Sequence, residues 1–412
     1  MKEIKRDLYL HQLVASIDNG LIKIVTGIRR SGKSYLLDPL FKTHLLNNGI
    51  NENHIIKLNL DDRKNRQYHN PDALDDFVRN KIKDNKTYYV IIDEIQLVKD
   101  FESVLNGFLN MKNLDIYVSG SNSKFLSTDI ITEFRGRGQQ IRVYPLSFSE
   151  YLEANTKEKN EAFQDYIRYG GMPLVLSMAS DEQKSRYLKD LLELTYFKDI
   201  IERNNIQKID VLESLVNILA SSIGSLTSAT KLTNSFISNC NKGLSKNTVI
   251  QYLTYLCDSF LIEKVNRYDV KGKRYIQSLV KYYFSDIGLR NARLNFRQQE
   301  ENHLMENLVY NELIRRGYNV DIGIVEIREK DDKKQLEVDF VCNQAGRRYY
   351  IQVASNLDTR EKTVREQRPL MNISDNFKKV MIVKNNIKPW LTEEGILVIG
   401  IIDFLLDFDI IK

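Results

Sequence analysis

One segment near the start of the chain, Gly27-Ile-Arg-Arg-Ser-Gly-Lys-Ser34, restricts the possible folds more than any other feature. It matches the phosphate-binding loop pattern GxxxxGK[ST] at every fixed position. An apolar run ends at Thr26 and a helix begins at the lysine, which is the strand–loop–helix context that the pattern requires. We predict one continuous helix from Ser34 to Leu46. The glycines let the loop turn tightly, so that its backbone N–H groups and the helix N-terminus face a phosphate group. The segment therefore predicts a parallel α/β sheet with a nucleoside-triphosphate site.

Every residue of this loop is a candidate ligand of a nucleotide. Lys33 would place its positive charge on the β- and γ-phosphates of ATP, and the hydroxyl of Ser34 would complete the coordination shell of Mg²⁺. Backbone N–H groups serve as ligands as well as side chains. The predicted nucleotide-binding residues are those of this segment and the residue after it: Gly27, Ile28, Arg29, Arg30, Ser31, Gly32, Lys33, Ser34 and Tyr35.

A second motif ends an almost wholly apolar run, Tyr88-Tyr-Val-Ile-Ile-Asp93, which Glu94 follows directly. Such a run is typical of a strand that is covered on both faces. Ligands of α/β sheets collect at the carboxyl ends of the strands. We predict that Asp93 holds Mg²⁺ and that Glu94 polarises the attacking water. The pair, together with Lys33, indicates hydrolysis of ATP rather than binding alone.

Two further polar segments follow along the chain. The strand-like run Leu114-Asp-Ile-Tyr-Val-Ser119 leads to Asn122, a candidate contact of the γ-phosphate, although a solvated turn explains this segment equally well. Arg135 and Arg137 flank Gly136. Guanidinium groups there would stabilise the charge that develops during phosphoryl transfer, either in the same chain or in a neighbouring subunit.

Length and composition limit the classes of protein to consider. The chain has 412 residues, 42% hydrophobic and 28% charged, which is typical of two or three folded domains and excludes a disordered chain. Its three cysteines form no CxxC pair, which favours a reducing compartment. No apolar run reaches the ~18 residues of a membrane helix, so we expect a cytoplasmic protein. A net charge of +5 is too small for the overall basic field of a dedicated nucleic-acid protein.

The pattern along the chain predicts three parts. Strand-like and helical segments alternate over residues 1–150, which is typical of a parallel sheet with helices on its faces. The pattern turns helical over residues 151–290, apart from a strand pair near its end, and α/β alternation returns over residues 291–412. We therefore predict an α/β fold with a P-loop core, a helical middle region and a C-terminal α/β domain.

Six ordered motifs resemble those of prokaryotic, archaeal-type AAA+ P-loop ATPases that carry a restriction-endonuclease-like C-terminal domain of unknown function. After the phosphate loop come Asp93-Glu-Ile-Gln96, Ser119-Gly-Ser-Asn122, Arg135-Gly-Arg137, Pro145-Leu-Ser-Phe148 and Tyr169-Gly-Gly-Met-Pro173. The resemblance covers essentially the whole chain. It implies an AAA+ core, a helical lid with a winged-helix-like region, and a nuclease-like domain, in that order. It also implies that Pro173 lies against the nucleotide base.

The middle region ends in a pattern that resembles a winged helix. Helical periodicity over residues 211–222, 229–237 and 245–257 is followed by a strand pair around the basic turn Lys271-Gly-Lys-Arg274. In DNA-binding examples the third helix enters the major groove and the wing contacts phosphates. The segment Lys264–Lys281 contains six basic residues and one acid. The pattern is equally compatible with DNA binding and with contacts between domains or proteins.

The C-terminal part resembles PD-(D/E)xK nucleases but lacks part of their active-site pattern. Glu306 on a predicted helix and Asp339 after a predicted strand match two of the acids. Gln352 stands where a further carboxylate is needed to bind Mg²⁺, and Ala354 where a lysine is needed to orient water. Glu337 is the one other acid nearby. We predict a degenerate domain that serves binding or regulation and has no nuclease activity.

Two functions remain open for the whole chain. The first is an AAA+ ATPase that uses ATP and Mg²⁺ to drive or gate a conformational change, with DNA as a candidate partner, and that forms a homo-oligomer if Arg135 or Arg137 acts in trans. The alternative is a nucleotide-gated switch that binds DNA or protein and has little intrinsic turnover. A P-loop kinase is disfavoured because the sequence shows no phosphate-acceptor pocket and no lid lysines.

Overall fold

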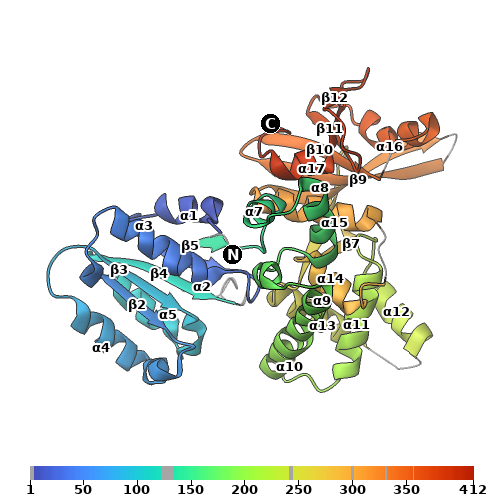
Figure 1. Cartoon of the computed structure of the whole chain (residues 1–412). Helices are drawn as coiled ribbons and strands as arrows, with labels where there is room; N and C mark the ends of the chain where they lie inside the picture. Colours follow the sequence, from blue (N-terminus) through green and yellow to red (C-terminus); the bar gives the residue numbers. More distant parts are fainter. Residues whose placement is uncertain are drawn as a thin grey trace. The chain divides into compact units, whose positions relative to one another are not determined.

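Two β-sheets organise the described part of the chain, which comprises residues 4–121, 134, 136–240, 245–297, 301–329, 332–355 and 357–412 of the computed structural model. The chain divides into two units. Met1–Pro145 with Asp258–Phe260 form the first unit, and Leu146–Cys257 with Leu261–Lys412 form the second. Each unit has its own sheet and its own hydrophobic core (Figure 1).

The first unit is built on a five-stranded sheet with the order β2-β3-β4-β1-β5. Every neighbouring pair of strands is parallel, which confirms the predicted α/β core. The last strand begins at Gly138 and pairs with β1 along the whole length of β1. The strands are β1 (Ile22–Thr26), β2 (Ile55–Asn59), β3 (Tyr88–Asp93), β4 (Leu114–Gly120) and β5 (Gly138–Arg142).

Strand β3 is an interior strand that is buried along its whole length, as its apolar run predicted. Successive side chains of a strand point to opposite faces of the sheet. Val90 and Ile92 accordingly belong to the hydrophobic cluster on one face, and Tyr89 and Ile91 to the cluster on the other. An interior parallel strand therefore has to be apolar on both faces.

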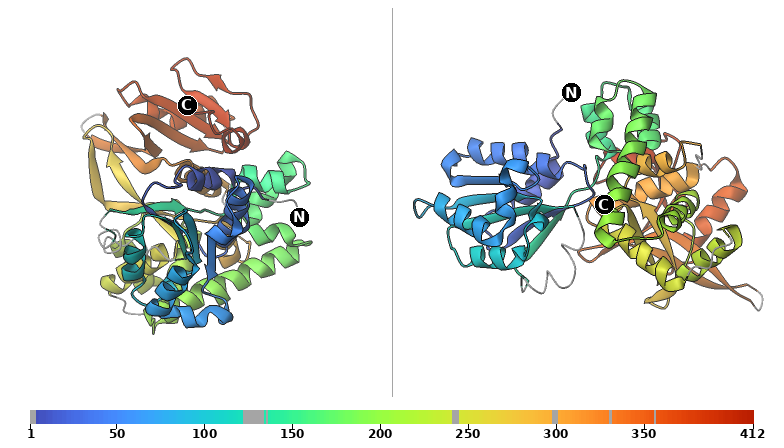
Figure 2. Two further views of the ribbon diagram at one scale, coloured as in Figure 1. Left: turned by 90° about the vertical axis from the view of Figure 1, so that its left-hand side faces the viewer. Right: turned by 90° about the horizontal axis from the view of Figure 1, so that it is seen from below.

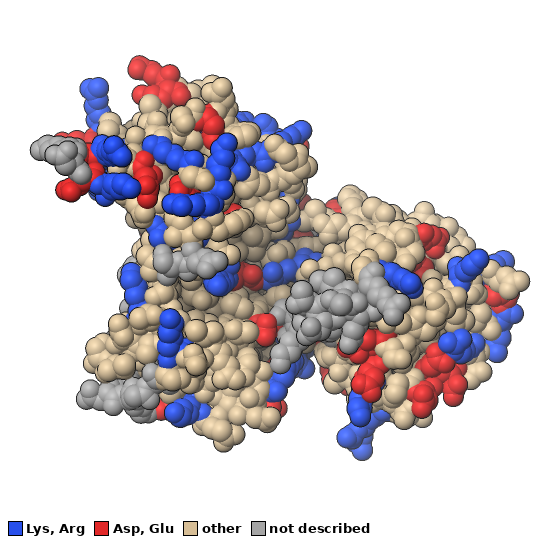
Figure 3. Space-filling view, turned by 180° about the vertical axis from the view of Figure 1, so that it is seen from behind, with Lys and Arg blue, Asp and Glu red and all other residues tan. Residues whose placement is uncertain are grey.

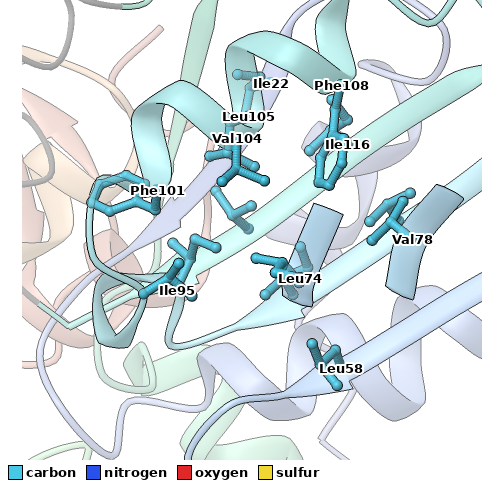
Figure 4. Packing of buried hydrophobic residues seen from close by; sticks show 14 of the residues in the cluster. Ile22, Leu58, Leu74, Val78, Ile95, Phe101, Val104, Leu105, Phe108 and Ile116 are labelled. Carbon is cyan, nitrogen blue, oxygen red and sulfur yellow. The ribbon is translucent and has the colours of Figure 1, made fainter. Parts of the chain in front are cut away.

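The first face is covered by α4 (Pro71–Lys81) and α5 (Phe101–Leu109), whose apolar side chains pack onto the strands (Figure 4). Helix α4 begins at Pro71 because Asn70 caps it: the side-chain oxygen of Asn70 accepts hydrogen bonds from two N–H groups of the first turn. Each fully buried leucine or phenylalanine contributes about 1.5–3 kcal/mol to stability. This packing makes the sheet a rigid base for the loops at its edge.

The other face is covered by α1 (Asp7–Val14) and by the helical segment that follows the phosphate loop. That segment was predicted as one helix from Ser34 to Leu46. It consists instead of α2 (Lys33–Tyr35), η1 (Leu36–Phe41) and α3 (Lys42–Asn47). The interruption is at Asp38, whose backbone is extended (φ −147°, ψ 115°). Asp38 precedes Pro39, and the residue before a proline is disfavoured in the helical conformation.

The second unit begins with a helical region. Its first helix starts with a capping box, in which the Ser147 hydroxyl accepts from the Glu150 N–H and the Glu150 carboxylate accepts from the Ser147 N–H. No helix among the described residues is long and apolar enough to cross a membrane. The helical elements are α7 (Phe148–Ala154), α8 (Lys159–Tyr169), η6 (Pro173–Ser177), α9 (Asp181–Asp190), η7 (Leu191–Phe197), α10 (Lys198–Asn204), α11 (Ile209–Ser221), α12 (Ala229–Cys240), α13 (Lys246–Asp258) and α14 (Ile287–Arg293).

The second sheet has eight strands in the order β12-β13-β11-β10-β9-β8-β6-β7. Figure 2 shows the ribbon from two further sides, with these strands in the yellow to red part of the chain. Helices α15 (Glu301–Arg315), α16 (Arg360–Met371) and α17 (Ile401–Leu406) accompany it. Its strands are β6 (Ile262–Asp269), β7 (Arg274–Phe284), β8 (Asn319–Glu329), β9 (Asp332–Gln344), β10 (Arg347–Ala354), β11 (Lys378–Val383), β12 (Trp390–Leu391) and β13 (Leu397–Gly400).

The hairpin β6–β7 joins this sheet rather than standing apart in the middle region. Arg267–Asp269 of β6 pair in parallel with Ile322–Ile324 of β8. The sheet therefore runs across the predicted boundary between residues 290 and 291, and that boundary stays a prediction. A hairpin has two outer edges, and hydrogen bonding one of them into a larger sheet satisfies backbone groups that would otherwise need water.

Candidate functional site

The strand order of the first unit brings three predicted segments to one edge of the sheet. β4 lies between β1 and β3, with Ser119 opposite Val25 and Val118 opposite Ile92. The phosphate loop leaves the carboxyl end of β1, and Asp93 is the last residue of β3. The parallel directions of the strands thus place both motifs at the same edge, where α/β sheets bind ligands.

The backbone of the phosphate loop requires glycine at two positions. Gly27 has φ 140° and Gly32 has φ 99°, both in the region that residues with a side chain rarely adopt. A Cβ atom at Gly27 would overlap the carbonyl oxygen of Val143, whereas a Cβ at Gly32 would meet open space. A side chain at position 27 would therefore both clash with Val143 and strain the backbone, whereas a side chain at position 32 would only strain the backbone. Ser31 also contacts Val143, with 3.3 Å between its hydroxyl and the same carbonyl oxygen.

Lys33 is almost fully buried at the start of α2, and its ammonium group is held by the loop itself. The Nζ atom donates to the carbonyl oxygens of Gly27 (3.0 Å) and Ile28 (3.2 Å). Burial lowers the pKa of Lys33 to about 8, although the nearby Glu94 and Asp93 carboxylates act in the opposite direction. The side chain is thus mainly protonated at pH 7.

Asp93 and Glu94 are connected through Ser119. The Ser119 hydroxyl donates a hydrogen bond to Asp93 Oδ1 and accepts one from the Glu94 backbone N–H at 3.1 Å. Ser119 is fully buried, so its hydroxyl fixes the Asp93 carboxylate and the backbone of Glu94. From the sequence we had singled out Asn122 in this segment, and Asn122 lies outside the described residues. A local signal marks Ser119 as a polar residue at the end of an apolar run, whereas its hydrogen-bond partners depend on the order of the strands.

The carboxylate of Glu94 is oriented by two side chains. Gln96 donates its amide N–H to Glu94 Oε2, and the Ser121 hydroxyl lies 3.4 Å from the same oxygen. Glu94 itself has a left-handed backbone (φ 57°), which is uncommon for a residue with a side chain. Both contacts are made to Oε2 of Glu94, and neither involves Oε1, the other oxygen of this carboxylate.

Arg137 lies at the amino ends of the strands, whereas its own phosphate loop leaves from the carboxyl end of β1. Its carbonyl oxygen accepts from the N–H of Ile22, the first residue of β1, and Arg137 directly precedes β5. The length of β1, about 13 Å at 3.3 Å per residue, separates it from the loop. The side chain of Arg137 is exposed. This position opposes a contact between Arg137 and a nucleotide bound to the same chain. Arg135 lies outside the described residues.

The motif Tyr169–Pro173 belongs to the second unit, where Asp286 holds it. The Asp286 carboxylate accepts from the N–H groups of Gly171 (2.7 Å) and Leu289 (3.0 Å), which connects the motif to α14. A Cβ atom at Gly170 would overlap this carboxylate, which explains a glycine there. Pro173 begins η6. Its predicted place against the nucleotide base stays a prediction.

Burial raises the pKa of Asp286 to about 6, although the backbone N–H groups oppose this shift. Asp286→Asn is expected to cost about 1–3 kcal/mol at pH 7, because an amide N–H would face a backbone N–H donor. The wild-type carboxyl takes up a proton in the folded state below pH 6, before it does so in the unfolded chain, and asparagine does not titrate. The stability of the wild type relative to the variant should therefore increase as the pH falls from 7 to 4.5.

Urea unfolding of both proteins at pH 7 and pH 4.5 measures this difference. Asp199→Asn serves as a control, because Asp199 pairs with Arg203 on a single helix of the same unit. An equal difference between wild type and Asp286→Asn at both pH values would contradict the predicted titration.

The residues singled out in the C-terminal part lie on neighbouring elements. Asp339 on β9 donates its backbone N–H to the side-chain oxygen of Gln352 on β10, at 3.4 Å. Ala354 packs in the hydrophobic cluster of the second unit. Glu306 on α15 and Glu337 on β9 both contact Lys281, a residue for which the sequence suggested no such role.

The basic segment Lys264–Lys281 is divided between surface and interior. Lys264, Lys271, Lys273 and Arg274 are exposed, whereas Arg267 and Lys281 are buried. Figure 3 shows Lys and Arg interspersed with Asp and Glu on the face that it draws. The segment is therefore a smaller basic surface than its six charges suggested, because two of them are used inside the fold.

Comparison with known proteins agrees with this picture. Residues 19–152 match the AAA domain family, residues 160–300 match a domain of unknown function (DUF8612), and residues 301–404 match another (DUF4143). An "Uncharacterized protein" of Haemophilus influenzae is 33% identical over 410 residues, which cover 98% of each chain. The chain belongs to the same family as this protein, and its first domain is an AAA domain. This identifies a nucleotide-binding P-loop protein of the AAA+ type.

Other similarities are more distant. "Uncharacterized protein MJ1544" of Methanocaldococcus jannaschii is 29% identical over 332 residues, which cover 78% of this chain and 71% of that protein. The structure of the Aeropyrum pernix ORC1 protein in complex with DNA aligns with 71% of this chain and 92% of its own, at 9% identity and a TM-score of 0.35. AMPPCP-bound DnaA from Aquifex aeolicus aligns with 62% of this chain and 88% of its own, at 15% identity and a TM-score of 0.31.

Proposed function

We propose that this AAA+ protein binds ATP together with Mg²⁺ and hydrolyses the ATP. The observation that carries the proposal is the hydrogen-bonded series Asp93–Ser119–Glu94, at the sheet edge from which the phosphate loop leaves. It holds one carboxylate suited to a cation next to one suited to accept a proton. A site for nucleotide binding alone has no need of the second carboxylate.

The chain's residues divide the chemistry among them. The backbone N–H groups of the loop and the ammonium of Lys33 would bind the phosphates. The Ser34 hydroxyl and the Asp93 carboxylate are oxygen donors of the kind that Mg²⁺ prefers, and the bound ion would neutralise phosphate charge. Glu94, oriented by Gln96 and Ser121, would accept a proton from the attacking water.

We propose further that an arginine of one subunit completes the site of another. Arg137 is exposed and lies at the far edge of the sheet from its own loop, which favours action in trans. An arginine finger contributes about 10³-fold or more to the rate of phosphoryl transfer. The rate of ATP hydrolysis per molecule is therefore expected to rise with protein concentration.

Steady-state hydrolysis over a range of protein concentrations, with particle mass measured in parallel, tests this proposal. Arg137→Ala and Arg135→Ala are compared with Arg186→Ala, a matched control whose side chain is 86% exposed in the second unit. A monomer that is fully active when dilute would contradict an arginine acting in trans, while hydrolysis itself would still be supported.

The alternative is a nucleotide-gated switch with little turnover. Three helices, α11 to α13, followed by the β6–β7 hairpin support it, because this is the layout of a winged helix. Four exposed basic residues of the hairpin segment are suited to phosphate contacts. Adding duplex DNA to the same hydrolysis assay separates the two functions. A switch should turn over slowly alone and bind DNA in an ATP-dependent and salt-sensitive way.

A further inference from the structure

A buried lysine lies among three acids in the second unit, far in sequence from the nucleotide site. Lys281 on β7 is 3% exposed. Its Nζ atom is 2.7 Å from Glu306 Oε1 and 2.7 Å from Glu337 Oε1. Glu306 comes from α15 and Glu337 from β9, so one ammonium group joins three separate elements.

The surroundings of this lysine are polar and hydrogen-bonded. The Tyr283 hydroxyl donates to Glu306 Oε1, the same oxygen that Lys281 contacts. Asp339, the third acid, accepts a hydrogen bond from the Val353 N–H at 2.7 Å. The Gln352 amide oxygen, where a further carboxylate was expected, is occupied by the Asp339 N–H. The acids are thus fixed in place without any external ligand.

A buried carboxylate needs a compensating charge, because the loss of hydration costs several kcal/mol per ion. Lys281 supplies that charge. Burial alone would lower the pKa of Lys281, but Glu306, Glu337 and Asp339 raise it above its ordinary value, so the side chain stays protonated. Glu306 is buried too, and Lys281 holds its pKa below the usual range despite that burial.

We propose that the Lys281 ammonium is the permanent cation of this carboxylate site and takes the place that a divalent metal would need. A metal bound to carboxylates lies 2.0–2.6 Å from their oxygens, so an ammonium already in contact with two of them leaves no room for it. Among the described residues, no group of three or more His, Cys, Asp or Glu side chains is arranged to hold a metal ion. This inference is independent of the proposed ATP hydrolysis.

Two consequences distinguish an occupying lysine from a catalytic one. The wild type should bind no Mn²⁺ at these acids. Removal of the ammonium should free the Glu306 and Glu337 oxygens that it contacts. These two carboxylates can then bind a divalent cation together with water. A catalytic lysine would instead work beside a metal, and its loss would abolish metal-dependent cleavage.

Titration of the full-length chain with Mn²⁺, without nucleotide, tests the inference by electron paramagnetic resonance and by thermal unfolding. Lys281→Ala is expected to bind one Mn²⁺ more than the wild type does, at Mn²⁺ concentrations at least tenfold below any at which the wild type takes up that ion, with a metal-dependent rise in Tm. Lys281→Ala combined with Glu306→Gln should lose that gain, because it removes a ligand. Failure of folded Lys281→Ala to gain Mn²⁺ would overturn the proposal.

A second comparison covers the case in which Lys281→Ala does not fold without its counter-charge. Wild type and Asp339→Asn should then bind Mn²⁺ identically, because neither has an open site at these acids. Wild-type Mn²⁺ binding that Asp339→Asn abolishes would overturn the proposal. So would metal-dependent nicking of a plasmid by the wild type that Asp339→Asn abolishes.

Discussion

Glu94→Gln is expected to retain ATP binding within about twofold and to lose about 10²–10⁴-fold in the rate of hydrolysis. Glutamine preserves the size of the side chain and an oxygen that can accept from Gln96 and Ser121. Its amide cannot take a proton from water. The left-handed backbone at residue 94 and the bond from its N–H to Ser119 do not depend on the carboxylate. Only the chemical step should therefore be lost.

Single-turnover hydrolysis and equilibrium binding of ATP, measured on the same preparation, separate these two effects. Glu52→Gln is the matched control, because Glu52 is an exposed acid that precedes β2 at the other edge of the sheet. If Glu94→Gln hydrolyses ATP at the wild-type rate, the proton is accepted elsewhere and the proposed role of Glu94 is wrong.

Lys33→Ala is expected to weaken ATP binding by roughly 100-fold, which corresponds to the loss of charge-assisted bonds worth about 3 kcal/mol. The fold should survive, because burial already disfavours the charged form of Lys33 and alanine removes that cost. Because its pKa is lowered to about 8, Lys33 loses its charge in the free protein above that pH. ATP affinity of the wild type should therefore decline between pH 7.5 and 9, and that of the variant should not.

Isothermal titration with ATP and Mg²⁺ at several pH values measures both effects. Lys112→Ala is the control, because Lys112 is an exposed lysine in the turn that leads into β4. Unchanged ATP affinity in a correctly folded Lys33→Ala protein would refute the proposed phosphate contact.

Local patterns were sufficient to predict the phosphate loop and the sheet around it. Glycines at 27 and 32 report a backbone conformation, and the apolar run before Asp93 reports a strand buried on both faces. These are properties of a few consecutive residues, so they can be read without knowing what packs against them. The interruption at Asp38 also had a local cause in Pro39, and the prediction of one continuous helix overlooked it.

Residue roles that depend on distant partners could not be predicted in the same way. The role of Ser119 follows from the position of β4 between β1 and β3, which a strand pattern alone does not reveal. The position of Arg137 at the amino ends of the strands, away from the phosphate loop, follows from the parallel pairing of β5 with β1. The sequence left open whether Arg137 acts on its own loop or on that of a neighbouring subunit, and strand direction opposes the first.

The amino-acid sequence by itself thus determined a P-loop α/β domain with a phosphate loop and two acids, because glycine conformation, strand burial and residue spacing are local. The assignment to the AAA+ class rested on the resemblance of six ordered motifs. The tertiary structure alone decided which charged side chains are exposed and which are buried. Lys281 belonged to a basic segment that was equally compatible with DNA binding and with contacts between domains or proteins, yet it is buried against Glu306 and Glu337. The partners of a buried charge come from elements far apart in the chain. Such a charge needs them because it has lost its hydration.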